Sequence, residues 1–207
     1  MTTSITSLFV SKVYREDLPA ASCRPLLAEL ERAARMLAVE DGAGIAWAGE
    51  HDYPGYTSYA SLNDLPVRDP AFADLKDLLD RHVLAFAREL DLDLGGRGLE
   101  LDSLWVNILP PGGYHTAHIH PHSVISGTIY VVVPKGASAL RFEDPRLPMM
   151  MAAPPRKAKA RDDNRTFVSI APKPGTILLW ESFVRHEVPV NHGKSDRITV
   201  SFNYRWE

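Results

Sequence analysis

The spacing of apolar residues changes near Leu101, and this change limits the possible folds more than any other feature of the chain. Before this point, apolar residues recur about every 3.6 positions in two long segments, as on one face of a helix. After it, they alternate with polar residues in short runs separated by Pro, Gly and Asn, as in strands. Helices followed by strands predict an α+β fold, mainly β, whose strands close into a barrel or sandwich. The length of 207 residues fits a single domain over residues 1–207.

The first half of the chain, residues 1–100, is expected to supply helical support. One helix covers about residues 25–39 and ends near Asp41-Gly42, since glycine favours a helix end. A second helix begins at Asp69, a preferred N-cap, followed by Pro70 in the first turn. Its buried face is predicted from apolar residues at helical spacing, namely Phe72, Leu75, Leu79, Val83 and Phe86. Residues 5–13 are expected to form a first strand and residues 53–56 a loop.

The second half, residues 101–207, is expected to form the β core. The predicted strands lie at 104–109, 124–133, 139–142, 166–170, 176–180 and 197–204. The last strand has an apolar side (Ile198, Val200, Phe202, Tyr204) and a polar side (Arg197, Thr199, Ser201, Asn203). A polar side is typical either of an edge strand facing solvent or of the lining of a barrel mouth. Residues 147–165 interrupt the strands and form either a solvated loop or a lid.

Four histidines lie within eight residues, at positions 115, 118, 120 and 122, and His186 lies far downstream. His118 and His120 form a His-x-His pair, whose two rings point to the same side if the segment is a strand. Neutral imidazole is a common ligand of Fe, Zn, Cu and Ni, so this arrangement predicts a metal site that the fold completes. It also favours the barrel-lining interpretation of the last strand. His115 and His122 are expected to be supporting donors or surface residues.

Composition excludes several classes of protein. A net charge of −3 and a pI near 6.2 lack the basic surface of a nucleic-acid binder. The one cysteine, Cys23, cannot form an internal disulfide and fits a reducing compartment. The first residues do not resemble a signal peptide, and no apolar run has the length of a membrane span. We therefore expect a soluble cytoplasmic protein.

From residue 101 onward, an ordered set of motifs resembles the iron(II)/2-oxoglutarate-dependent oxygenases. The set consists of Trp105-Val106-Asn107, Pro111-Gly112, His118-Ile119-His120-Pro121, Ser126-Gly127-Thr128-Ile129-Tyr130, Phe142-Glu143-Asp144-Pro145-Arg146, Lys173-Pro174-Gly175-Thr176, His186 and Arg197. It is most similar to a poorly characterised bacterial and phage subgroup with a His-x-His-Pro motif. The resemblance implies a double-stranded β-helix (jelly-roll) core with the N-terminal helices on its outer face.

The resemblance also implies roles for individual residues. His118, His120 and His186 would hold Fe(II), and 2-oxoglutarate would be the cosubstrate. Arg197 matches the family's cation for the far carboxylate of 2-oxoglutarate, because arginine is permanently charged and bidentate. The further candidates for binding this cosubstrate are Thr199, Asn107, Tyr130 and Asn203. No catalytic residue beyond the metal ligands is implied.

One departure from the family pattern keeps other functions open. His120 stands where the family has a carboxylate ligand, which puts the usual chemistry in doubt and favours metals that prefer imidazole. The alternatives are a cupin-like metal-dependent dioxygenase or isomerase without 2-oxoglutarate, or a non-catalytic metal-binding barrel. The expected partner is a small-molecule or peptide substrate, with neither nucleic acid nor membrane. The sequence does not indicate the prime substrate or the oligomeric state.

Overall fold

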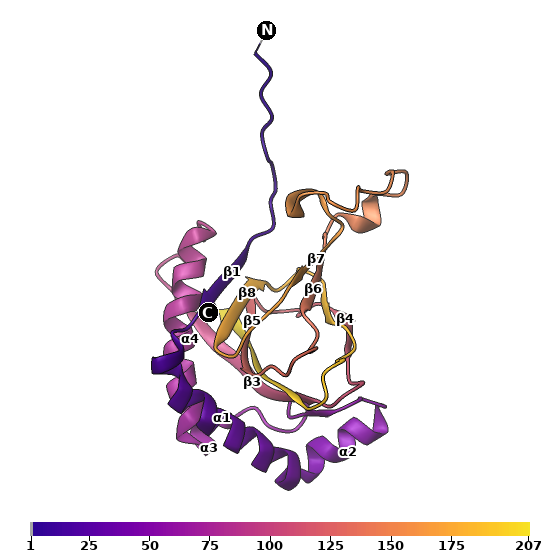
Figure 1. The fold of residues 1–207 in the computed structure, drawn as a ribbon. Coiled ribbons are helices and arrows are strands. Elements are labelled where there is room, and N and C mark those ends of the chain that lie inside the picture. Colours follow the sequence, from indigo (N-terminus) through magenta and orange to yellow (C-terminus); the bar gives the residue numbers. More distant parts are fainter. Residues whose placement is uncertain (1) are drawn as a thin grey trace.

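The computed structural model describes residues 2–207 and has two antiparallel sheets that face each other around a central space (Figure 1). The larger sheet has the order β1 (Val13–Asp17), β8 (Thr176–Glu181), β5 (Ile125–Val132), β10 (Arg197–Trp206), β3 (Leu99–Leu109), β2 (Tyr56–Thr57). The smaller sheet has the order β4 (His115–His118), β9 (His186–Val188), β6 (Leu140–Glu143), β7 (Phe167–Ile170). The expected α+β, mainly β architecture is thus confirmed.

Four helices precede the β core: α1 (Ala20–Glu40), α2 (Gly42–Glu50), α3 (Leu65–Arg68) and α4 (Pro70–Glu89). The helix at α4 begins where the sequence predicts, because the Asp69 carboxylate accepts a hydrogen bond from the Ala71 backbone N–H at 2.9 Å. Helix α1 begins five residues before the predicted start at Pro25, which lies within its first two turns. Helices α2 and α3 were not predicted, since both are short.

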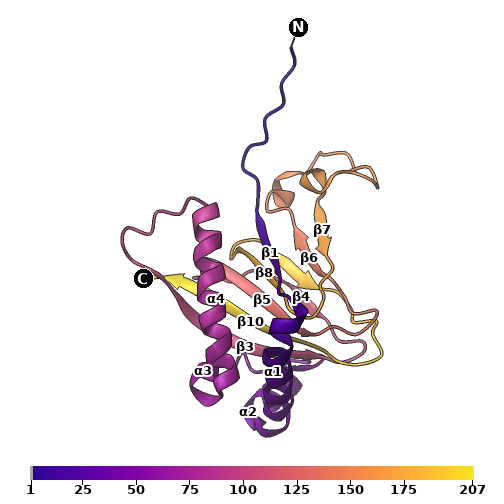
Figure 2. The same ribbon diagram turned by 60° about the vertical axis from the view of Figure 1, so that its left-hand side comes forward.

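Helices α1 and α4 cover the outer face of the larger sheet (Figure 2). The predicted face of α4 is confirmed, since its five apolar residues are at most 1 % exposed. They share one core with Leu30 of α1 and with the apolar side of β10, formed by Ile198, Val200, Phe202 and Tyr204. The polar side of β10 therefore faces the space between the two sheets. This agrees with the barrel-lining interpretation that the histidine pattern favoured in the sequence.

The expected first strand over 5–13 is wrong for most of its length. Strand β1 begins at Val13, which pairs with Trp180 one residue before β8 ends. The chain before Val13 has no strand partner and extends away from the sheet as an arm (Figure 1). Side chains such as Ile5 and Phe9 in this arm are at least 90 % exposed. Strand propensity was present in the sequence, but the sheet offers no partner there.

Residues 147–165 form an extension between β6 and β7 that projects beyond the barrel (Figure 2). It contains two short 3₁₀ helices, η1 (Leu147–Met149) and η2 (Asp162–Asn164), and most of its side chains are exposed. In this conformation the segment is a solvated loop. Within residues 2–207, no helix is long and apolar enough to cross a membrane.

Candidate metal and cosubstrate site

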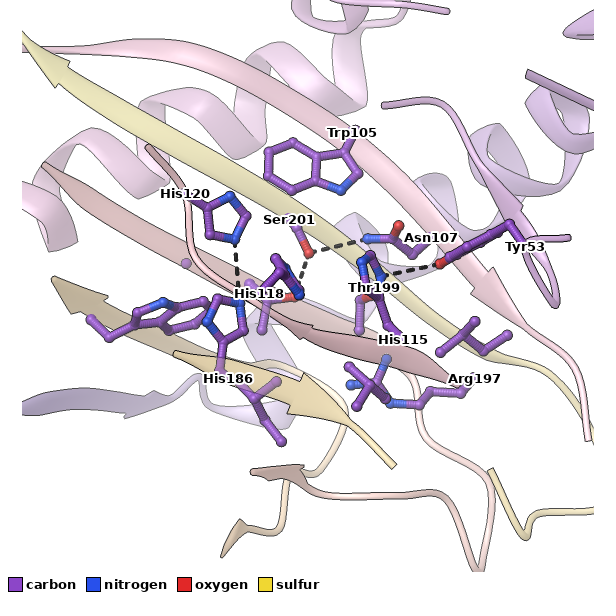
Figure 3. A pocket seen from close by; sticks show the side chains of 16 residues that line it. Tyr53, Trp105, Asn107, His115, His118, His120, His186, Arg197, Thr199 and Ser201 are labelled. Carbon is purple, nitrogen blue, oxygen red and sulfur yellow. Dashed lines mark hydrogen bonds between the residues drawn. The ribbon is translucent and has the colours of Figure 1, made fainter. Parts of the chain in front are cut away.

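Three histidine side chains converge at one end of the space between the sheets. His118, His120 and His186 each place one ring nitrogen within 4.8 Å of the others (Figure 3). The Nε2 atoms of His120 and His186 are 3.3 Å apart. Two nitrogen ligands of one ion, with bond lengths of roughly 2.1 Å and angles of about 90–110°, are separated by roughly 3.0–3.4 Å. The donor set therefore has the chemistry of a three-nitrogen metal site, and His120 and His186 also have the spacing of two ligands of one ion.

Backbone carbonyl groups fix the orientation of two of these rings. The Nδ1 atom of His118 donates to the Thr116 carbonyl at 2.7 Å, and Nδ1 of His186 donates to the Val184 carbonyl at 2.9 Å. Because a carbonyl oxygen can only accept, each Nδ1 carries the proton and each Nε2 keeps its lone pair. Metal-binding histidines in proteins are commonly held by such a second hydrogen bond.

Burial keeps the three rings neutral. Desolvation lowers the pKa of His118, lowers that of His120 to about 3, and lowers that of His186 to about 2. The proximity of the rings to one another adds to the effect for His120 and His186. Neutral imidazole is the form that binds metal ions, so the site is ready to bind a metal at neutral pH.

Strand pairing, and not the His-x-His spacing alone, assembles the three rings. His118 is the last residue of β4 and lies opposite His186 of β9 in the antiparallel register. His120 lies two residues beyond the end of β4, so the expectation of a strand through both histidines is wrong. Its backbone N–H donates to the Ser182 carbonyl at 3.1 Å, and this contact holds the residue beside the other two.

The same pocket contains a buried arginine. Arg197 begins β10, is 2 % exposed, and lies with its guanidinium 4.9 Å from the centre of the Tyr130 ring. Within the described residues, no carboxylate forms an ion pair with Arg197, and its Nε atom has no hydrogen-bond partner. A buried cation without a partner is costly. The pocket is therefore suited to an anionic ligand.

Polar side chains lie between the arginine and the histidines (Figure 3). Thr199 and Ser201 point inward from β10, on the same side as Arg197. Asn107 points inward from β3. The Asn107 Nδ2 donates to the Ser201 hydroxyl at 3.2 Å, whereas its Oδ1 has no partner. The parity prediction for β10 thus places Arg197, Thr199 and Ser201 correctly.

Two of the sequence candidates lie outside the lining of the pocket. Asn203 is separated from it and bonds to the hydroxyls of Ser126 and Ser103, at 2.8 and 3.1 Å. Tyr130 is fully buried, and its hydroxyl lacks a partner. Its ring lies against the Arg197 guanidinium, and it is not among the residues that line the pocket.

Two lining residues extend the histidine cluster: His115, which the sequence left as a supporting donor or a surface residue, and Tyr53, which it did not assign to the site. His115 stacks on His118 with ring centres 4.4 Å apart, because a register shift in β4 brings both rings together. The Tyr53 hydroxyl lies 3.4 Å from Nδ1 of His115, and Tyr53 comes from the helical half of the chain. No periodic signal marks Tyr53, whereas His115 was already among the clustered histidines. His122 is exposed and does not line the pocket.

A family model described as "Putative 2OG-Fe(II) oxygenase" matches residues 103–203, which is nearly the whole β core. This match over residues 103–203 supports placing the chain among the iron(II)/2-oxoglutarate oxygenases, and so supports an enzyme of that class. No curated protein matches the chain.

Several solved structures share the fold. A prolyl-4-hydroxylase of Pseudomonas putida superimposes with a TM-score of 0.62 at 18% identity, covering 93% of this chain and 92% of that chain. The 2-oxoglutarate (alpha-ketoglutarate)-dependent epimerase SnoN of nogalamycin biosynthesis gives 0.61 at 16% identity, covering 94% and 76%. HygX of Streptomyces hygroscopicus, with nickel and 2-oxoglutarate bound, gives 0.60 at 14% identity, covering 94% and 82%. These likenesses confirm the predicted double-stranded β-helix.

Proposed function

We propose that the oxygenase binds iron(II) through His118, His120 and His186 and binds 2-oxoglutarate through Arg197. The observation that supports this most directly is the presence of the three neutral imidazoles and the buried, unpaired guanidinium in one pocket. Neither feature is explained by folding stability. Each is explained by a ligand that has a metal-chelating end and a free carboxylate end.

Iron(II) and 2-oxoglutarate, when bound, supply the electrons that activate dioxygen for the oxidation of a substrate. The side chains of this chain position the reactants. Arg197 offers two parallel N–H donors to the far carboxylate, and the Thr199 hydroxyl, on the same side of β10, offers a third. Asn107, whose Oδ1 is free, can accept a hydrogen bond within the pocket. The Tyr130 ring packs against the guanidinium.

Apolar side chains exclude water from the reacting centre. Trp180 packs edge-on against His186 with ring centres 4.6 Å apart, and Trp105 lies 5.7 Å from His120. Leu140 and Val188 line the wall of the smaller sheet. A site of low polarity strengthens the hydrogen bonds within it and protects reactive species from solvent.

The substrate is proposed to be a small molecule or a peptide, and the working compartment a reducing one such as the cytoplasm. The narrow pocket between the sheets suits a small group or an extended side chain, and Cys23 is free. Because three imidazoles replace the usual set with a carboxylate, metal preference needs direct measurement.

The deciding experiment uses protein purified without chelator. Its metal content is measured first, and calorimetric titration of anaerobic, iron-loaded protein then gives the affinity for 2-oxoglutarate. Admission of oxygen should convert 2-oxoglutarate to succinate in the presence of substrate, with slow uncoupled conversion in its absence. Metal binding without 2-oxoglutarate binding would favour a cupin-like enzyme instead.

A further inference from the structure

The walls of the pocket carry no negative charge. None of the 16 side chains that line it is acidic (Figure 3). Two carboxylates of the smaller sheet next to His186 are paired outside the pocket. Glu187 forms an ion pair with Arg141, and Glu143, one residue from the strand partner of His186, forms one with Arg185 at 3.3 Å. No acidic side chain among the lining residues therefore balances a cation bound between the sheets.

This leaves a charge imbalance when the proposed ligands bind. A divalent metal and the Arg197 guanidinium carry three positive charges, of which dianionic 2-oxoglutarate balances two. The three imidazoles are neutral and contribute nothing. If position 120 held a carboxylate, the same complex would be neutral. A net positive charge in a water-poor pocket attracts one further negative charge, because little solvent screens it.

We propose that the prime substrate is an organic monoanion of the carboxylate type, whose charged group enters this pocket and replaces the charge that His120 lacks. This inference rests on the proposed function and specifies its substrate class. A monoanion fits better than a phosphate monoester, because a second negative charge would again leave an imbalance.

His115 offers a donor for such a group. The His115 ring lines the pocket beside His118, with ring centres 4.4 Å apart, and the Tyr53 hydroxyl lies 3.4 Å from its Nδ1. Tyr53 also lines the pocket, so its hydroxyl and a ring N–H of His115 are both placed where an anion within the pocket could accept from them. The proposed function gives these two side chains no other task.

The test uses two small probes of nearly equal size, formate and formamide, which differ in charge. Anaerobic, nickel-loaded and 2-oxoglutarate-saturated protein is titrated with each probe. Binding is followed by the nickel absorption bands and by the fluorescence of Trp105 and Trp180, which line the pocket. We expect formate to bind at least tenfold more tightly than formamide, without releasing 2-oxoglutarate.

Two variants with the same change of residue type separate site charge from total charge. His120→Asp restores a carboxylate to the site and should abolish most of the preference for formate. His122→Asp makes the same substitution at an exposed histidine outside the pocket and should keep the preference. If His120→Asp binds no metal, the relative affinities of the natural protein for formate and formamide still test the inference.

Equal affinity for formate and formamide, displacement of 2-oxoglutarate by formate, or an unchanged preference in metal-loaded His120→Asp would overturn the inference. Each of these results leaves the proposed function intact, because 2-oxoglutarate binding is measured in the same sample. Absence of 2-oxoglutarate binding to the metal-loaded natural protein would instead refute the proposed function.

Discussion

The exchange Arg197→Lys tests the cosubstrate site most directly, because it keeps the positive charge and removes only the shape of the donor. Arg197 is 2 % exposed and its guanidinium packs against the Tyr130 ring, and both features restrict its motion. A lysine ammonium in the same place would bond to one carboxylate oxygen where a guanidinium bonds to both.

The expected loss of 2-oxoglutarate affinity in Arg197→Lys follows from the one hydrogen bond that is lost. A hydrogen bond to a charged group contributes about 1.5–3 kcal/mol, and each 1.4 kcal/mol is a factor of ten in affinity. The dissociation constant of 2-oxoglutarate should therefore rise by roughly 10- to 150-fold. Metal content should not change, because Arg197 is not one of the three converging nitrogen donors.

Calorimetric titration of anaerobic, iron-loaded protein gives the affinity for 2-oxoglutarate, and elemental analysis of the same sample gives the metal content. Arg205→Lys is the matched control, since Arg205 is exposed and pairs with Glu100 at 3.5 Å on the far part of β10. Its affinity for 2-oxoglutarate should equal that of the natural protein. Equal affinity in Arg197→Lys, with metal retained, would show that the buried arginine serves another ligand.

Three further results are expected. Alanine at His118, His120 or His186 should abolish most metal binding, as measured by elemental analysis. The variants His122→Ala and His115→Ala should keep their metal. Metal retained in any of the first three variants would contradict the proposed ligand set. Leu79→Ala should lower the free energy of unfolding by about 2–5 kcal/mol in urea titrations, because this side chain is fully buried, while Leu84→Ala on the exposed side of α4 should cost far less. Burial lowers the pKa of His82 from 6.5, so the unfolded chain takes up a proton there more readily, and stability should fall as the pH drops below about 6.5. In His82→Gln this fall between pH 7.5 and 5.5 should be smaller; an equal fall in both proteins would refute the assignment.

Local patterns in the sequence determined several parts of this protein. Asp69 and Pro70 set the start of α4, because capping and the fixed proline backbone act within a few residues. The alternation along β10 placed Arg197, Thr199 and Ser201 on one side and the core residues on the other. Both signals are properties of a single continuous segment, so no knowledge of its neighbours was needed.

Only the tertiary structure decided how the site is assembled. Strands β4 and β9 have four and three residues, too few to show a period, and their pairing is what sets His118 opposite His186. Tyr53 reaches His115 across 62 positions of the chain from a segment that carries no local pattern. Contacts between such distant segments depend on the closure of two sheets around a shared space. Apolar packing between the sheets, such as that of Trp180 against Leu140 and Phe142, holds them together, and no short stretch of sequence contains it.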